Sequence, residues 1–399
     1  MIDLRAARND AERYRAALAR KGAAETFDAL LAADERWRSL VPRVDELRSQ
    51  TKLKGKPTPD QATELQKVKE ELKAAEAELV AAEAARDDLS LRVPNPPHDD
   101  VPDGSTEGDV IEIRRLGEPA PLEEPREHLE IGRFDMERAA RMSGARFGYW
   151  IGDTARVALA LYRLALDRLA AKGFVTVLPP VLVREDALVG TGAFPSDEAN
   201  VYELPADGLY LAGTAEIPLA SLHAGEILDE AELPLRYVAF SPCFRREAGA
   251  AGRDTRGMIR VHQFNKVEQF ALTRPEDSWD EHELLLTNTE ELVRELGLPY
   301  RIVVLPAGDM SSASAKTYDV EVWFPSQERY REGASVSNTT DFQARRLGIR
   351  MRGARGLEPV HMLNGTAVVD RMALAILENF QGEVPDVLVG YGAPTHVRP

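Results

Sequence analysis

The sequence predicts an α+β protein, in which an antiparallel helical hairpin of the coiled-coil type precedes a larger domain built on an antiparallel sheet. Three observations lead to this prediction. Apolar residues near the N-terminus recur at alternating spacings of three and four, and a segment rich in Pro, Gly and acidic residues follows. The rest of the chain mixes strand-like and helical runs without regular alternation. A chain of 399 residues has room for both parts.

Two apolar seams predict the hairpin. The first occupies residues 30–47, and the second begins at Leu65 and continues to Ala82. Between them lies TKLKGKPTPD, whose Gly and two Pro residues should break a helix. Two heptad seams joined by a short break are typical of an antiparallel helical hairpin. Pro42 falls inside the first seam and should kink that helix or start a new turn.

Lysines gather where the hairpin should turn. Of the ten lysines in the chain, six lie between Lys52 and Lys73. From Arg48 to Lys73, seven basic residues stand against four acids, which leaves a local excess of three positive charges in a chain of net charge −16. Two interpretations stay open: a solvated helical surface, which the pattern alone favours, or a patch that contacts RNA phosphates.

The segment from Arg92 to Pro125 is rich in Pro, Gly and acids and predicts a linker. We therefore expect a hairpin domain at 1–100, a linker at 101–125 and a larger domain at 126–399. Strand-like runs in the larger domain follow no regular βαβ order, which favours an antiparallel sheet flanked by helices. These runs are VTVLPPVLV, LYLAGTAEI, LRYVAFSPCF, IRVHQF, KVEQFALT, YRIVVL and YDVEVWF.

Composition excludes several classes of protein. No run of about 18 uncharged apolar residues exists, so no membrane-spanning helix is expected. The N-terminus carries acids throughout and has no apolar core typical of a signal peptide. The single cysteine, Cys243, excludes an internal disulfide framework and a cysteine-based zinc cluster. We therefore expect a cytoplasmic protein, and the net charge argues against a general nucleic-acid binder.

The stretch from Phe240 to Phe270 is the most informative part of the chain. Arg245 opens an Arg–Arg–Glu cluster, a Gly- and Arg-rich loop follows, and strand-like alternation returns through Lys266 and Glu268. This order suits a hairpin whose first strand presents a guanidinium to a phosphate. Its second strand would present an aromatic face and a carboxylate. Arginine suits phosphate because its planar fork donates two parallel hydrogen bonds.

This stretch closely resembles motif 2 of class II aminoacyl-tRNA synthetases, in the form found in seryl-tRNA synthetases. KGFVTVLPP resembles motif 1, which the family uses at its dimer interface, and GTAEIPL resembles its serine-binding element. KTYDVEVWFPSQERYRE and SNTTDFQARR are similar to its long strands and the loop after them, and LNGTAVVDRMALAILENFQ resembles motif 3. The resemblance implies a homodimeric class II catalytic domain.

The implied reaction has two steps. L-serine and ATP give seryl-adenylate and pyrophosphate, and the seryl group then passes to the 3′-end of tRNA(Ser). The hairpin would bind the tRNA, with contacts from Lys52, Lys54 and Lys56 near its tip. Whether tRNA(Sec) is also charged stays open. Adenylate formation needs no protein base, because the serine carboxylate is already a nucleophile, so His262 and His361 are interpreted as structural.

The serine pocket must satisfy an ammonium, a carboxylate and a small hydroxyl. Glu216 and Glu268 offer negative charge to the ammonium, and Arg245 can span the serine carboxylate and the α-phosphate. A pocket that hydrogen-bonds a hydroxyl rejects analogues lacking it, because its own polar groups are then unpaired. The resemblance assigns serine binding to Thr214, Glu216, Arg245, Glu268, Asn364 and Thr366.

The resemblance also assigns the nucleotide site. Glu247 would read the adenine amino group, Phe264 would stack on the ring, and Arg371 would hold the γ-phosphate. Glu332 and Ser335 would bind the Mg²⁺ that bridges the ATP phosphates, with water and phosphate as its other ligands. The residues assigned to ATP are Arg245, Glu247, Phe264, Glu332, Ser335 and Arg371. Arg245 and Arg371 would stabilise charge during catalysis.

Three departures from the family pattern surround this site. The motif 3 loop is one residue shorter than usual, and Asp370 puts a carboxylate beside Arg371, where it could weaken the local positive charge or pair outside the pocket. Residues 333–336 read GASV where the family usually has ISSC, and residues 311–315 read SSASA where Gly and an aromatic residue are usual. We expect an altered pocket that is still active.

Other functions remain as alternatives. The chain could be a specialised or inhibitor-tolerant paralogue, which the changes near the pocket would suit. It could also load serine onto an acceptor other than tRNA, but such enzymes lack the long hairpin. A catalytically inactive RNA-binding scaffold would be expected to lose Arg245, Glu247 or Arg371, and all three are present.

Overall fold

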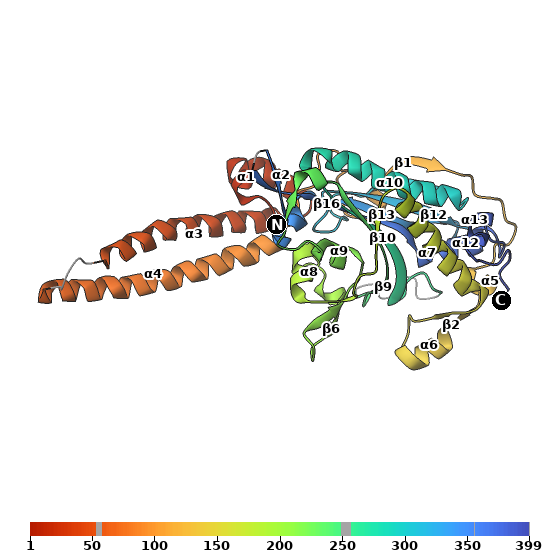
Figure 1. Cartoon of the computed structure of the whole chain (residues 1–399), viewed down its shortest axis with the longest axis horizontal. Coiled ribbons are helices and arrows are strands. Elements are labelled where there is room, and N and C mark those ends of the chain that lie inside the picture. The colour runs from red at the N-terminus through yellow and green to blue at the C-terminus, as the bar shows by residue number, and fades with distance from the viewer. Residues whose placement is uncertain (53–57, 249–256, 355, 399) are drawn as a thin grey trace. The chain divides into compact units, whose positions relative to one another are not determined.

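The computed structural model describes residues 1–52, 58–248, 257–354 and 356–398. They divide into two compact units, Met1–Pro96 and Pro97–Pro399. The described elements of the first unit are helices (Figure 1). They are α1 (Leu4–Asn9), α2 (Ala11–Ala19), α3 (Ala24–Gln50) and α4 (Pro59–Arg92).

The long helices α3 and α4 pair side by side, which confirms the predicted hairpin (Figure 1). Val44 and Leu47 of the first seam are buried with Ala75 of the second. Thr58 and Gln61 form a capping box at the start of α4: Thr58 Oγ1 accepts from the Gln61 backbone N–H, and Gln61 Oε1 accepts from the Thr58 backbone N–H. α3 continues through Pro42 as one helix.

The second unit is built on an eight-stranded sheet of order β1-β11-β12-β13-β16-β10-β9-β4 (Figure 1). All neighbours pair antiparallel except β4, which runs parallel to β9. The α+β prediction is confirmed, with this one parallel edge. The strands are β1 (Ile111–Leu116), β4 (Val175–Val177), β9 (Leu235–Phe244), β10 (Gln263–Thr273), β11 (Tyr300–Val304), β12 (Lys316–Phe324), β13 (Arg329–Asn338) and β16 (His361–Val369).

Several expected strands take a different form. The segment 101–125, predicted as a linker, forms η1 (Glu107–Asp109) and the edge strand β1. The strand was not predicted because its short run IEIRRL lies between segments rich in Pro and Gly. The proposed domain limits otherwise stay a prediction. The run VTVLPPVLV gives two short strands because its adjacent prolines cannot donate to a ladder. LYLAGTAEI leaves its strand at Leu211 and enters a helix at Glu216, and of IRVHQF only the last two residues, Gln263 and Phe264, belong to a strand, as the start of β10.

Three helices pack against the sheet and form the main core with it: α7 (Asp153–Ala171), α10 (Ser278–Glu295) and α12 (Asp370–Asn379). Shorter helices connect the strands, namely α5 (His128–Ile131), α6 (Met136–Ser143), α8 (Glu185–Thr191), α9 (Glu216–Ser221), α11 (Phe342–Leu347) and α13 (Asp386–Val389). The remaining strands form three small sheets: β2 (Phe134–Asp135) with β3 (Tyr149–Trp150), β5 (Leu182–Val183) with β7 (Leu209–Leu211) and β6 (Tyr202–Leu204), and β15 (Gly356–Pro359) with β14 (Arg350–Gly353) and β8 (Ile227–Asp229).

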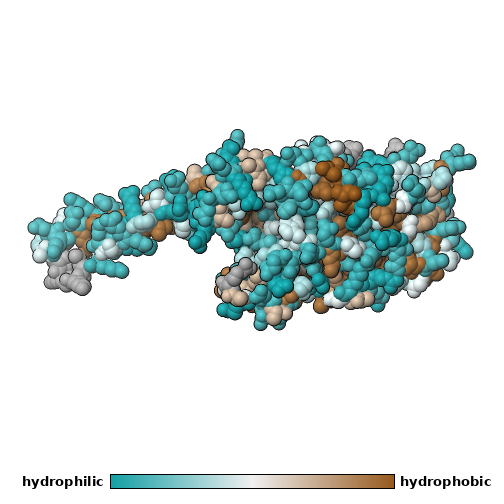
Figure 2. All heavy atoms as spheres, turned by 90° about the horizontal axis from the view of Figure 1, so that it is seen from above, coloured by the Kyte–Doolittle hydropathy of each residue, from teal (hydrophilic) through white to brown (hydrophobic). Residues whose placement is uncertain are grey.

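The surface is mainly hydrophilic on the face drawn in Figure 2, with apolar side chains gathered in patches. Among the large apolar side chains that the second unit exposes are Val175 of β4 and the nearby Leu178, at 58% and 79% exposure. Among the described helices, none is long and apolar enough to cross a membrane.

Candidate active site

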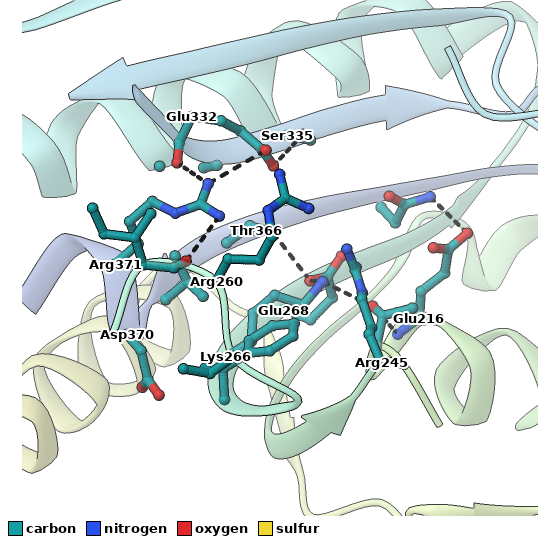
Figure 3. A pocket seen from close by; sticks show the side chains of 18 of the residues that line it. Glu216, Arg245, Arg260, Lys266, Glu268, Glu332, Ser335, Thr366, Asp370 and Arg371 are labelled. Atoms are coloured by element: carbon teal, nitrogen blue, oxygen red, sulfur yellow. Dashed lines mark hydrogen bonds and ion pairs between the residues drawn. The ribbon is translucent and has the colours of Figure 1, made fainter. Parts of the chain in front are cut away.

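A cavity of about 290 Å³ in the second unit collects every residue that the sequence assigns to serine, ATP or metal (Figure 3). They come from strands β10, β13 and β16, from the turn after β9, from the bend before α9, and from the first turns of α9 and α12. The eleven residues are Thr214, Glu216, Arg245, Glu247, Phe264, Glu268, Glu332, Ser335, Asn364, Thr366 and Arg371. Their individual roles stay a prediction.

Strand geometry accounts for much of this convergence. Successive side chains of a strand point to opposite faces, so residues two apart share one face. In β10, Phe264, Lys266 and Glu268 therefore line the cavity together. In β16, Asn364 and Thr366 do the same beside them.

Two β-bulges interrupt the regular alternation of side chains between the two faces of the sheet. Glu332 and Ser335 of β13 are three residues apart and would face opposite sides of a regular strand. The register with β12 shifts between the pairs Val320↔Ala334 and Glu321↔Glu332, which leaves Gly333 as the extra residue. This bulge lets both side chains line the cavity.

The second bulge lies in β16. Its register with β10 shifts between the pairs Val267↔Val368 and Glu268↔Thr366, so Ala367 has no partner in that ladder. Thr366 keeps its place opposite Glu268, and the strand ends one residue before α12 begins with Asp370.

One end of the cavity is a buried polar cluster. Lys266 and Glu268 are 7% and 1% exposed, and the lysine Nζ lies 2.5 Å from the carboxylate Oε2 of Glu268. The same Nζ donates to Thr214 Oγ1 at 2.8 Å, and Thr366 Oγ1 donates to Glu268 Oε2 at 3.5 Å. Lys266 was not among the predicted site residues, although its place two residues before Glu268 was a signal that it shares the same face.

Glu216 completes this end. Its Oε1 accepts hydrogen bonds from Gln343 Nε2 at 2.7 Å and from Asn364 Nδ2 at 3.0 Å. Burial, and then the negative charge of Glu268, raise the pKa of Glu216 above its ordinary value. Gln343 was not predicted, because it lies on α11, and the sequence alone does not show that its side chain reaches Glu216 at the start of α9.

Arginines line the rest of the cavity: Arg245 lies beside Glu216 and Glu268, and Arg371 lies at the other end (Figure 3). The Arg245 guanidinium lies 5.4 Å from the centre of the Phe264 ring, and its Nε donates to the Gly213 carbonyl oxygen at 3.3 Å. Arg260, which the sequence did not single out, donates from Nη1 to Glu247 Oε2 at 2.6 Å. Glu247 has φ +52°, a left-handed conformation that turns the chain out of β9.

Arg371 meets Glu332 at this end (Figure 3). Its Nη1 donates to the Glu332 carbonyl oxygen at 2.5 Å and lies 3.4 Å from the carboxylate Oε2. Its Nη2 donates to the Ile259 carbonyl oxygen at 3.4 Å. Loss of solvation would raise the pKa of Glu332, but the positive charges of Arg371 and Arg245 outweigh it and lower that pKa.

The predicted metal ligands lie next to a second carboxylate. Ser335 Oγ donates to Asp319 Oδ1 at 2.6 Å. Burial and the charge of Glu332 raise the pKa of Asp319 well above its ordinary value. In the part of the chain that the structure describes, no group of three or more His, Cys, Asp or Glu side chains could hold a metal ion. Glu332 and Ser335 thus fit an ion that takes most of its ligands from phosphate and water, as Mg²⁺ does.

Asp370 pairs outside the pocket, which decides between the two interpretations of this residue. Its Oδ2 accepts from the Asn265 backbone N–H at 3.0 Å, and its Oδ1 accepts from the Tyr162 hydroxyl. Asp370 lines the cavity, but its carboxylate points away from Arg371 (Figure 3). Burial raises the pKa of Asp370 to about 6.

The other departures do line the cavity. Gly333 and Ala334 form part of its wall, as do Ser311 and Ser314, whose hydroxyl oxygens are 2.8 Å apart. Both serines also line a wider cavity of about 1340 Å³ that adjoins the first and shares Arg371 with it. These departures therefore lie at the pocket, and an altered pocket that is still active stays a prediction.

The remaining predicted residues lie elsewhere. Lys52 is exposed in the first unit, while Lys54 and Lys56 lie outside the described residues. His262 Nδ1 lies 3.0 Å from the Arg245 carbonyl oxygen, and His361 Nδ1 lies 2.8 Å from Ser278 Oγ. Neither histidine lines the cavity, as expected for structural residues.

Comparisons with known proteins agree with this geometry. Residues 1–97 match the model of the seryl-tRNA synthetase N-terminal domain, and residues 202–380 match that of the tRNA synthetase class II core domain (G, H, P, S and T). The chain is 45% identical to the serine–tRNA ligase of Streptomyces coelicolor over 98% of its length and 97% of the relative's. It superposes on seryl-tRNA synthetase from Pyrococcus horikoshii complexed with ATP with a TM-score of 0.93, at 38% identity and full coverage of both chains. It also matches the cytoplasmic serine–tRNA ligase from Naegleria fowleri in complex with AMP, with a TM-score of 0.87, 32% identity and 97% and 95% coverage.

Proposed function

The chain belongs to the seryl-tRNA synthetase family and is a serine–tRNA ligase, and we propose that the cavity of about 290 Å³ is the site where it activates serine with ATP. The convergence of all eleven assigned residues on one cavity carries this proposal. They come from segments up to about 150 residues apart in the chain, so neighbourhood in sequence does not bring them together.

Serine binds at the buried end. Its ammonium meets Glu268, Glu216 and the Thr214 hydroxyl, and its carboxylate turns toward Arg245. Lys266 balances the charge of Glu268, so the zwitterion meets one buried ion pair together with the carboxyl group of Glu216. The serine hydroxyl is read by Thr366 together with Glu268.

ATP binds at the arginine end. Phe264 offers its ring face to the adenine, and Glu247 accepts from the adenine amino group, while Arg371 and Arg245 hold phosphate oxygens. Mg²⁺ at Glu332 and Ser335 supplies further charge neutralisation when it is bound. A serine carboxylate oxygen then attacks the α-phosphorus, the bond to the β-phosphate oxygen breaks, and pyrophosphate leaves with the electron pair.

The transfer step uses the first unit. The terminal ribose hydroxyl of tRNA(Ser) attacks the seryl carbonyl, and AMP leaves. The hairpin helices bind the tRNA, with Lys52, Lys54 and Lys56 near the turn. The proposal leaves open whether tRNA(Sec) is also charged.

We further propose a homodimer. The edge strand β4 lies within the stretch that resembles motif 1, and it exposes Val175 while the residues after it expose Leu178. Burying these apolar side chains against a second copy of β4 would remove them from water and cover a free sheet edge.

Amino-acid-dependent exchange between ATP and pyrophosphate, measured across the twenty amino acids without tRNA, tests the proposal. Exchange with serine alone is expected. Charging assays with tRNA(Ser) then distinguish an enzyme that charges tRNA from a paralogue that transfers serine to another acceptor. Exchange with no amino acid would favour the inactive scaffold. Weaker inhibition by a non-hydrolysable seryl-adenylate analogue than that of a housekeeping enzyme would identify an inhibitor-tolerant form, and equal inhibition constants would contradict it.

A further inference from the structure

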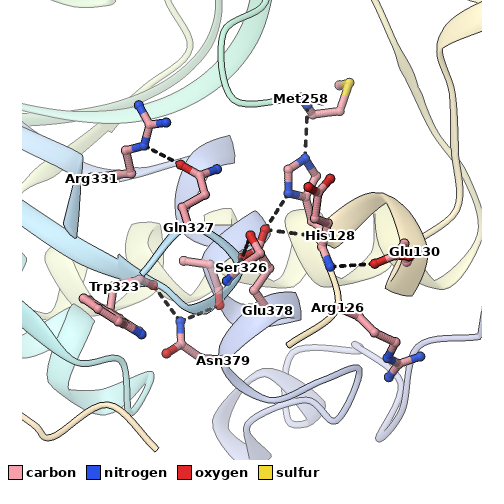
Figure 4. A network of polar contacts seen from close by, with 12 residues as sticks. Arg126, His128, Glu130, Met258, Trp323, Ser326, Gln327, Arg331, Glu378 and Asn379 are labelled. Atoms are coloured by element: carbon pink, nitrogen blue, oxygen red, sulfur yellow. Dashed lines mark hydrogen bonds and ion pairs between the residues drawn. The ribbon is translucent and has the colours of Figure 1, made fainter. Parts of the chain in front are cut away.

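A buried network of polar contacts lies at the end of α12 that is far from Arg371 (Figure 4). Its centre is the pair of His128 in α5 and Glu378 in α12, whose side chains are 3% and 0% exposed. His128 Nδ1 lies 2.7 Å from Glu378 Oε1. The other carboxylate oxygen accepts from Ser326 Oγ at 2.6 Å and from the Ser326 backbone N–H at 3.3 Å.

The hydrogen bonds fix the state of the His128 ring. The backbone N–H of Met258 donates to His128 Nε2 at 3.2 Å, so Nε2 carries no proton. Nδ1 therefore holds the ring proton and donates it to Glu378. Glu378 thus selects the tautomer that leaves Nε2 free to accept, which is the usual way in which one ring nitrogen sets the role of the other.

The Met258 backbone matters because it begins one wall of the cavity. Met258, Ile259, Arg260 and Val261 all line it before the chain enters β10. Arg371, at the first turn of α12, donates to the Ile259 carbonyl oxygen at 3.4 Å. Both ends of one helix therefore hold the same four-residue wall: the first turn directly, and the last turn through His128.

The approach of the wall to His128 is close. Gly257, next to Met258, has φ +77°, and a Cβ atom there would lie 2.8 Å from His128 Nε2. A side chain at this position would thus collide with the ring as well as strain the backbone. The hydrogen bond between Met258 and His128 therefore depends on this close approach of the chain to the ring at Gly257.

We propose that His128 is a positioning residue for ATP binding: held by Glu378, its ring fixes the Met258 backbone and with it the wall formed by residues 258–261. This inference rests on the proposed function, since it assigns the wall to the nucleotide end of the cavity. Arg260 of this wall bonds Glu247, the residue proposed to read adenine, so a displaced wall weakens ATP binding and leaves serine binding in place.

Two substitutions separate the two contacts of the ring. In His128→Asn, the amide nitrogen can take the place of Nδ1 and keep the bond to Glu378, while the acceptor for Met258 is lost. In His128→Gln, the longer side chain can bring an oxygen near the position of Nε2 and keep the acceptor. Ser326→Ala is the matched control, because it removes one bond to Glu378 and leaves Met258 untouched.

The full-length variants are compared in serine-dependent ATP–pyrophosphate exchange, in thermal unfolding and in hydrogen–deuterium exchange of the Met258 amide. His128→Asn should raise KM for ATP about five- to tenfold, the cost of one buried hydrogen bond, with KM for serine changed less than about twofold. The Met258 amide should exchange faster, His128→Gln should lie closer to wild type, and Ser326→Ala should lower Tm alone.

A purely structural role predicts a different result. His128→Asn would then behave like Ser326→Ala, with lower Tm, unchanged KM for ATP and unchanged exchange of the Met258 amide, and this overturns the proposal. If His128→Asn does not fold, Gly257→Ala decides in its place, because the added Cβ would collide with the His128 ring and displace the wall: unchanged KM for ATP and unchanged exchange of the Met258 amide overturn the proposal. If wild type shows no serine-dependent exchange, the proposed function fails, and the Met258 amide still tests the positioning: unchanged protection in the variant overturns it.

Discussion

The two ends of the cavity are built in opposite ways. At the serine end, Glu268 is 1% exposed and already paired with Lys266, and Thr366 is 7% exposed. At the nucleotide end, the Glu332 side chain is 55% exposed and that of Arg371 is 23% exposed. One end is a closed set of satisfied polar groups, and the other presents charges to open space.

The difference matches the size and charge of the two substrates. A small zwitterion gains selectivity from polar groups that are held in place before it arrives, because an analogue then leaves them unpaired. A polyanion such as ATP gains most from cations that it can reach, and Arg371 and Arg245 line this cavity in addition to making their protein contacts. The serine end should therefore control selectivity, and the nucleotide end should control the rate of the chemical step.

The largest expected effect is at the nucleotide end. Arg371→Ala should lower kcat of serine-dependent pyrophosphate exchange by about 10²–10³-fold, the usual cost of removing one group that stabilises transition-state charge. Steady-state kinetics with varied ATP measure this effect. Arg371→Lys is the control: it keeps the charge and should recover part of kcat, whereas equal loss in both variants would show that geometry matters more than charge.

A comparable loss at the serine end should appear in a different parameter. Glu268→Gln leaves the buried Lys266 ammonium without its counter-charge, which costs about 3–5 kcal/mol of stability. In exchange assays with varied serine, kcat/KM for serine should fall at least 100-fold while KM for ATP changes little. If KM for ATP rose equally, the two ends could not be treated as separate.

Thr366→Val tests selectivity directly. It removes the hydroxyl that bonds Glu268 Oε2 and keeps the shape of the side chain. Discrimination between serine and alanine, measured as the ratio of kcat/KM values in exchange, should fall about tenfold, since one hydrogen bond is lost. An unchanged ratio would place recognition of the serine hydroxyl elsewhere.

The scaffold behind the nucleotide end should respond to pH through two opposed groups. Burial lowers the pKa of His282 from 6.5 to about 4, and its Nε2 donates to the Val336 carbonyl oxygen at 3.0 Å. Stability from this histidine is present above pH 6.5 and is lost as pH falls toward 4, by about 3 kcal/mol. Burial raises the pKa of Asp370 from 3.8 to about 6, so its contribution grows by about 3 kcal/mol as pH falls from 6 to 3.8.

Between pH 4 and 6 the two contributions nearly cancel in the wild type. His282→Gln should therefore make the protein relatively more stable on acidification, and Asp370→Asn should make it relatively less stable. Urea unfolding of both variants and wild type at pH 4, 5, 6 and 7 measures these differences. Parallel curves for all three proteins would contradict both pKa shifts.

The smallest expected effect involves the hairpin and neither end of the cavity. Changing Lys52, Lys54 and Lys56 together to Ala should weaken tRNA charging several-fold and reduce its dependence on salt, because fewer phosphate contacts release counter-ions. Exchange without tRNA is the internal reference. The matched control changes Lys67, Lys69 and Lys73, which removes the same charge from α4, and equal effects would show a general loss of attraction.

The sequence predicted those parts of the site that depend on local pattern. Glu268 and Thr366 could be assigned because each lies in a recognisable motif. Gln343 and the His128–Glu378 pair could not, because each depends on how distant helices pack. The strand β1 was missed for a related reason, since a short edge strand is specified by its partner β11 more than by its own residues. Asp370 left two interpretations, and only its contacts with Tyr162 and Asn265 decide between them.

The bulge at Ala367 has a consequence for how such a protein can evolve. In a regular strand, losing one residue turns every following side chain to the other face of the sheet. A strand that carries an unpaired residue can lose or gain length at that point, and the ladder on either side keeps its register. The motif 3 segment of this chain, which the resemblance predicts to be one residue shorter than the family pattern, brings Thr366 and Arg371 to one cavity. Insertions and deletions at this bulge should therefore be tolerated better than is expected for positions so close to the reacting atoms.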